Sequence, residues 1–125
     1  MHASPDATRS VVTPTLIGTA LQLLMVIAGH FTPAVAQLFA PGGMTISAIA
    51  GVLAALGSRP ASLGSAGGRG AVAGGVCAFI GILVSYLLGD VPAAVLGFGT
   101  ASSAVTGALG GLVGKVLSAR SAQRV

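Results

Sequence analysis

Two long runs of apolar residues dominate the chain, and each contains a short turn-like interruption near its middle. The first run extends from Pro14 to Leu56 and the second from Ala71 to Leu117. A helix rises about 1.5 Å per residue, so about 20 residues cross the ~30 Å hydrocarbon core of a bilayer. Each run is therefore long enough for two helical crossings. Neither run shows the alternation of apolar and polar residues that a membrane β-barrel strand requires.

This pattern predicts an all-α integral membrane protein with four transmembrane helices, arranged as two tandem helical hairpins. Two segments that contain Gly and Pro, at residues 29–33 and 89–92, are expected to form the turns within the hairpins. The expected layout is a cytoplasmic polar tail (1–12), a first hairpin (13–57), a cytoplasmic Gly/Ser-rich connector (58–69), a second hairpin (70–117) and a basic cytoplasmic tail (118–125). The four helices are expected at Pro14–Phe31, Pro33–Leu56, Gly70–Gly89 and Val91–Val116.

The two predicted hairpins resemble each other in sequence. When the second half is laid over the first, Pro92 falls on Pro33 and Gly110 falls on Gly51. Each hairpin contains an even number of spans, so two copies would insert in the same direction. The pattern therefore favours a parallel internal repeat, with a pseudo-twofold axis along the membrane normal.

The basic residues predict the orientation of the chain. All six Lys and Arg residues lie before the first apolar run, in the central connector or at the end of the second run. Basic residues in short loops are retained on the cytoplasmic side. We therefore expect a multi-pass protein of a bacterial inner membrane, with the connector and both termini in the cytoplasm.

Composition agrees with a membrane location. Charged residues make up only 6% of the chain and apolar residues 54%, whereas a soluble domain carries roughly 25% charged residues. The net charge of +4 does not indicate nucleic-acid binding, because no basic patch with interleaved aromatic residues accompanies it. The expected partner is the lipid bilayer, together with a second copy of the chain or another membrane protein.

An alternative interpretation applies to the first run. Arg9, the apolar run from Leu16 and the segment Ala34–Ala36 together resemble a secretory signal with cleavage after Ala36. The internal repeat argues against cleavage, because it assigns Pro33 to the start of a second helix.

Small residues recur every four positions on the second and fourth predicted helices. Residues four apart share one helix face, and small side chains let membrane helices approach closely. Two interpretations stay open: packing within one bundle, or a surface that joins copies of the chain or lines a narrow pore. The residues concerned are Gly43, Ser47 and Gly51 on the second helix and Gly99, Ser103, Gly107 and Gly111 on the fourth.

A few polar residues within the apolar runs are candidates for a path through the bundle. Gln22 is the deepest polar residue of the first predicted helix, and Ser102 and Thr106 form a line on the fourth. Pro41 removes a helix hydrogen bond and is expected to kink the second helix. A kink in a membrane helix can free backbone groups for a bound solute.

His30 and Asp90 occupy matching turns at the outer ends of the two predicted hairpins. They could meet as an ion pair there, or they could be two separate residues that cap helices at the membrane surface.

The sequence offers no chemistry for catalysis. It contains no phosphate-binding loop with a lysine, no cluster of metal ligands and no nucleophile with an adjacent base, so neither an enzyme nor a cofactor is expected. The single cysteine, Cys77, excludes an intrachain disulfide.

Two functional classes remain. The first is a structural or accessory membrane protein that packs into a homo-oligomer or a larger complex through its small-residue faces. The alternative is a channel or facilitator for a small solute. Ion-coupled pumping is not expected, because pumps keep ionisable residues inside the membrane.

Overall fold

The computed structural model describes residues 5–60 and 62–123, and every regular element in that part of the chain is a helix. Four of these helices contain stretches long and apolar enough to cross a membrane, at residues 9–31, 39–58, 63–87 and 94–120. The prediction of an all-helical chain with four such helices is therefore confirmed. In chain order the elements are α1 (Pro5–Phe31), α2 (Pro33–Ala36), α3 (Phe39–Ser58), α4 (Leu63–Leu87) and α5 (Ala94–Gln123).

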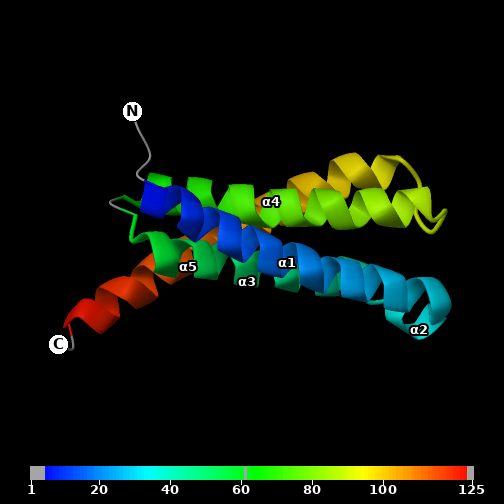
Figure 1. Ribbon diagram of the computed structural model, residues 1–125, viewed down its shortest axis with the longest axis horizontal. Coiled ribbons are helices and arrows are strands. Elements are labelled where there is room, and N and C mark those ends of the chain that lie inside the picture. The colour runs from blue at the N-terminus through cyan, green and yellow to red at the C-terminus, as the bar shows by residue number, and fades with distance from the viewer. Residues whose placement is uncertain (1–4, 61, 124–125) are drawn as a thin grey trace.

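The two ends of the structure differ in what they contain. The start of α1, the α3–α4 connection and the end of α5 lie at one end, which we call the connector end (Figure 1). The short helix α2 and the turn between α4 and α5 lie at the opposite end, which we call the turn end. Each long helix therefore crosses from one end to the other.

The second predicted helix is divided in the structure. Pro33 begins the single turn of α2, and α3 begins only at Phe39, so the interruption falls at Gln37 and Leu38. Pro41 lies in the first turn of α3. The backbone N–H groups of a first turn have no partner within the helix, so a proline is accommodated there. Pro41 therefore follows the break in this segment instead of kinking a continuous helix.

Helix α4 begins at Leu63, well before the expected start at Gly70. Ser62 precedes the helix in an extended conformation, and its hydroxyl oxygen accepts a hydrogen bond of 3.1 Å from the backbone N–H of Ser65. This is the usual way in which a serine satisfies one of the free N–H groups at a helix start. The Gly/Ser-rich segment that resembled a loop in the sequence is thus largely helical.

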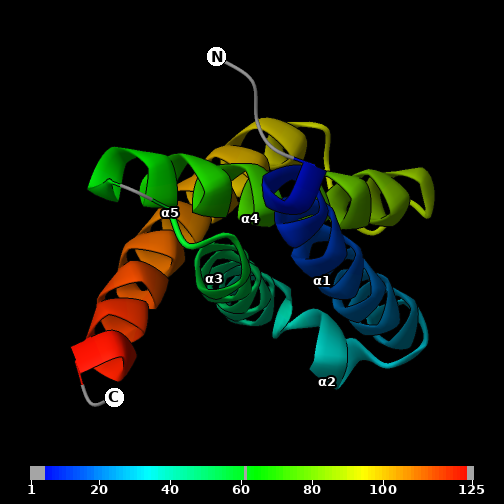
Figure 2. The same cartoon turned by 60° about the vertical axis from the view of Figure 1, so that its left-hand side comes forward.

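Helices α3 and α4 form the centre of the structure. Helix α3 packs against α1, α4 and α5, and α4 packs against α1, α3 and α5 (Figure 2). The residues buried on these two helices are mostly alanine, glycine and serine, and the small core cluster consists of Ala50, Ala54, Ala73 and Cys77. Side chains of this size allow the helix backbones to come close together.

The closest approach lies along α5, where glycines meet the backbones of α3 and α4. Gly107 lies against Gly70 and Gly74 of α4, and the backbone carbonyl of Gly107 in turn lies against Gly51 of α3. Gly111 lies against Ala66 of α4. We call this region, where α3, α4 and α5 meet around Gly107, the glycine seam. A side chain on any of these glycines would overlap a neighbouring backbone.

Candidate functional site

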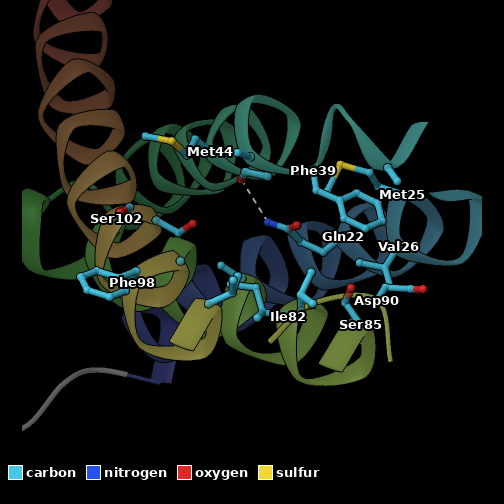
Figure 3. Close-up of a pocket in the computed structure, with 18 of the residues that line it drawn as sticks. Gln22, Met25, Val26, Phe39, Met44, Ile82, Ser85, Asp90, Phe98 and Ser102 are labelled. Atoms are coloured by element: carbon cyan, nitrogen blue, oxygen red, sulfur yellow. Dashed lines mark hydrogen bonds between the residues drawn. The ribbon is translucent and has the colours of Figure 1, made fainter. Parts of the chain in front are cut away.

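A cavity of about 480 Å³ lies between the helices on the turn-end side of the glycine seam. At this end α1 and α2 diverge from α4 and the start of α5 (Figure 1). Residues with little or no side chain, such as Gly43, Ala78 and Gly99, line part of its wall. The rest of the lining is mostly apolar, with Met25, Val26, Phe39, Ile82, Val95 and Phe98 among the contributors (Figure 3).

Gln22 of α1 is a polar residue that lines the inner end of the cavity. Its side chain is only 3% exposed, and its amide nitrogen donates a hydrogen bond of 3.1 Å to the backbone carbonyl of Gly43 in α3 (Figure 3). The same nitrogen lies 3.5 Å from the hydroxyl oxygen of Ser47. Ser47 and Cys77 both donate to the carbonyl of Gly74, over 3.1 and 3.3 Å. This network joins α1, α3 and α4 and holds the Gln22 amide in one orientation.

Besides Ser103 of α5, the buried polar residues on the cavity wall include Ser85 of α4. Its side chain is 2% exposed, and its hydroxyl has no hydrogen-bond partner among the described residues. A serine within a helix usually bonds back to the carbonyl one turn earlier. A hydroxyl that is buried without a partner is energetically unfavourable. The position of Ser85 on a cavity wall therefore makes it a candidate contact for a bound molecule.

The residues of the expected polar path are only partly brought together. Gln22 and Ser102 both line the cavity, but Thr106 is not among the lining residues. The Thr106 hydroxyl donates a hydrogen bond of 2.8 Å to the backbone carbonyl of Ser102. One turn beyond Ser103, the close packing at Gly107 closes the space between the helices. In this structure the cavity therefore ends inside the bundle.

His30 and Asp90 meet at the turn end. The ring nitrogen Nδ1 of His30 lies 2.8 Å from an Oδ2 oxygen of Asp90, and both side chains are partly exposed. Gly89 has a φ of 82°, a backbone conformation that glycine adopts without steric cost, and this places Asp90 on the α4–α5 turn. The contact joins the end of α1 to that turn, and Asp90 also lines the cavity.

The predicted small-residue positions contact other helices of the same chain or the cavity. Gly51, Gly107 and Gly111 belong to the glycine seam, and Ser47 belongs to the hydrogen-bond network that includes Gln22. The others line the cavity: Gly43 next to Gln22, Gly99 next to Ile82, and Ser103, which is buried.

Sequence reasoning did not single out Ser85, Gly70 or Gly74. Ser85 and Tyr86 are the only hydroxyl-bearing residues between Ala71 and Leu88, and that isolation within an apolar run was a usable signal. For the two glycines, the sequence carried no indication of which helix they would face.

Comparisons with protein-family models, with curated proteins and with solved structures found no match to this chain. Among the described residues there is also no group of three His, Cys, Asp or Glu side chains that could hold a metal ion. The architecture is that of a multi-pass membrane protein, and the cavity is the feature from which a function can be argued.

Proposed function

We propose that the protein is a facilitator that binds a small, largely apolar solute in the cavity between its helices, without ion-coupled pumping. The observation that carries this proposal is the cavity itself, which has a mostly apolar wall and three buried polar residues, Gln22, Ser85 and Ser103. Its volume falls within the range of roughly 300–1,000 Å³ that is typical of small-molecule sites. Such sites combine apolar walls with a few well-placed polar groups.

Passage of a solute requires the glycine seam to open. The cavity reaches from the turn end to Gln22, and beyond Ser103 the backbones of α3, α4 and α5 are in contact. Separation of α5 from α3 and α4 around Gly107 would extend the cavity toward the connector end. Such a movement would have to break the contacts of α5 with α3 and α4, which are the most extensive between helices in the described structure.

An accessory role in a homo-oligomer or a larger complex is the alternative. The stripe of small residues on α5 from Gly99 to Gly111 was a reason to expect self-association, and a second face of small residues, which includes Gly110 and Gly114, runs beside it. In the structure both faces have neighbours within the chain. Gly107 and Gly111 lie against α4, while Gly110 and Gly114 lie against Ala48 and Val52 of α3. The cavity is therefore the better-supported basis for a function.

Binding can be tested with 1-octanol as a neutral, largely apolar probe. The purified protein in detergent should melt at a higher temperature with octanol, because a ligand that binds only the folded state stabilises it. At ten times the dissociation constant the gain is about 1.4 kcal/mol. The control is Ala78→Leu, which places a larger side chain on the cavity wall. If octanol shifts both proteins equally, it acts on the micelle and the proposal fails.

We further propose that the connector end is cytoplasmic. Arg59 and Arg69 lie at this end, and Arg69 donates to the backbone carbonyl of Ser58 over 3.0 Å. Lys115 also lies there and donates to the carbonyl of Pro60 over 2.9 Å. Arg124 lies outside the described residues. Basic residues concentrated at one end favour retention of that end in the cytoplasm.

Reporter fusions in the α3–α4 connection and after the last residue test this orientation. Both should report a cytoplasmic location, whereas a fusion in the α4–α5 turn should report the opposite side. A reporter at the C-terminus that is active outside the cytoplasm would contradict the four-span arrangement.

An internal duplication remains our explanation for the similarity of the two halves. Matched positions in α3 and α5 support it, because Gly51 contacts Gly107 and Ala48 contacts Gly110. When the halves are exchanged, Gly51 becomes Gly110 and Ala48 becomes Gly107, so one contact is converted into the other. If α3 and α5 are related in this way, Gly51→Ala and Gly110→Ala will lower the melting temperature to a similar extent. A large effect at only one of the two positions would argue against it.

A further inference from the structure

Ser85 and Gln22 together define what kind of molecule the cavity can hold, an inference that rests on the proposed function. We infer that the solute is a neutral molecule with an apolar body and one hydroxyl group, and that the hydroxyl binds between Gln22 Oε1 and Ser85 Oγ. The apolar part of such a molecule would lie against the side chains of Phe39, Ile82 and Phe98 (Figure 3).

The orientation of the Gln22 amide leaves its oxygen available to accept a hydrogen bond from a solute. Its amide nitrogen is already used by the carbonyl of Gly43, which leaves the amide oxygen as the free group. Among the described residues, no donor reaches that oxygen. A hydroxyl group on the solute can supply one.

Ser85 can complete the arrangement from the neighbouring helix when its side chain turns toward the cavity, because its hydroxyl oxygen is fully buried in this structure. Gln22 packs against Gly81, and Ser85 lies one helical turn further along α4 on the same face. The four residues from Gly81 to Ser85 correspond to about 6 Å along the helix axis. A single hydroxyl between the two groups can donate to Gln22 and also exchange a hydrogen bond with Ser85, whose hydroxyl both donates and accepts.

The charges around the cavity favour a neutral solute. Among the described residues that line the cavity, Asp90 carries the only charge, and it lies 2.8 Å from His30. An anionic solute would meet the Asp90 carboxylate without a compensating cation. A cationic solute would have to compete with His30 for the Asp90 carboxylate, and its charge would be costly to bury beside Gln22 and Ser85, because neither side chain carries a compensating negative charge.

Three probes with the same eight-carbon chain test the inference: 1-octanol, n-octane and n-octylammonium. Apparent dissociation constants come from melting temperatures measured over a range of probe concentrations in the same detergent. Ser85→Ala should weaken octanol binding roughly fivefold, a factor that corresponds to about 1 kcal/mol, and should leave octane binding unchanged. Comparison of variants with one probe cancels the partition of that probe into the micelle.

Thr19→Val is the matched control. The Thr19 hydroxyl is also buried without a partner among the described residues, but Thr19 does not line the cavity. Removal of either hydroxyl should leave the unliganded protein at least as stable as before, because an unsatisfied polar group is lost. Only Ser85→Ala should change the response to octanol.

The possible results separate this inference from the function on which it rests. If octanol and octane both stabilise the protein and Ser85→Ala changes neither, the cavity binds apolar molecules and the hydroxyl site is wrong. A stronger response to octylammonium that disappears in Asp90→Asn would show that the site selects cations, which also overturns the inference. If no probe stabilises the wild-type protein more than Ala78→Leu, the proposed function fails as well.

Discussion

Replacement of Gly107 by alanine is expected to destabilise the protein by about 1–3 kcal/mol, the usual cost of overpacking. Gly107 lies where α5 meets α4, and a methyl group there would overlap the backbone carbonyl of Gly70 and come within 3.0 Å of the Gly74 Cα atom. Both neighbours are backbone atoms, so they can move only if the helices separate. Thermal unfolding in detergent measures the effect, and Gly107→Leu should be more damaging still.

Gly97→Ala is the control on the same helix. No atom lies within 4 Å of the space that its methyl group would fill, and alanine has the higher helix propensity. This variant should therefore be as stable as the wild-type protein or slightly more stable. If Gly107→Ala unfolds at the same temperature as Gly97→Ala, α5 does not pack on α4 as described. If Gly107→Leu lowers oligomer size while the chain stays folded, the surface around Gly107 joins copies of the chain.

The second large effect is expected at Ala73, in contrast to Ala78 on the same helix. Both side chains are almost completely buried, but Ala73 belongs to the core cluster whereas Ala78 lines the cavity. Ala73→Leu adds volume where none is free and should cost about 1–3 kcal/mol. Ala78→Leu adds the same volume beside empty space and should leave the melting temperature nearly unchanged.

Melting curves of the two variants, together with their response to 1-octanol, measure this contrast. Ala78→Leu should remain folded and lose the stabilisation by octanol. Equal destabilisation by both substitutions would mean that the space next to Ala78 is already filled.

The number of long apolar helices could be predicted from the sequence because it depends on length and hydropathy alone. About 20 apolar residues are needed to cross a bilayer, and each run between Pro14 and Leu117 contains enough for two helices. The proximity of His30 and Asp90 was one of two alternatives that the sequence left open, since the two residues fall at the same end of the predicted hairpins; in the structure His30 lies in the last turn of α1 and Asp90 in the α4–α5 turn.

Helix boundaries were harder to predict from the sequence where local composition and tertiary packing favour different conformations. Gly67, Gly68 and Gly70 have a low intrinsic preference for helix, so the segment before Ala71 resembled a connector. In the structure the cap at Ser62 starts α4 early, and packing of Gly70 against α5 provides a reason for helix in this segment. Tertiary packing commonly outweighs intrinsic propensity in this way.

The cavity could not be predicted, because it depends on how the helices diverge at the turn end. A stripe of small residues shows that something packs closely against it, but not which helix, and not whether that helix belongs to the same chain. The sequence similarly identified Gln22 as a buried polar residue without indicating that its amide would be held by Gly43. Ser85 becomes a candidate contact for a solute only because Gly81, one turn earlier on α4, packs against Gln22.

The most direct test of solute binding is to locate a bound probe in the crystallised protein. 8-Bromo-1-octanol carries an anomalous scatterer at one end of the chain and a hydroxyl at the other. We predict an anomalous peak inside the cavity, near the apolar side chains of Ile82 and Phe98, and density for the hydroxyl between Gln22 and Ser85. Bromine peaks confined to the lipid-facing surface, with no density in the cavity, would contradict the account.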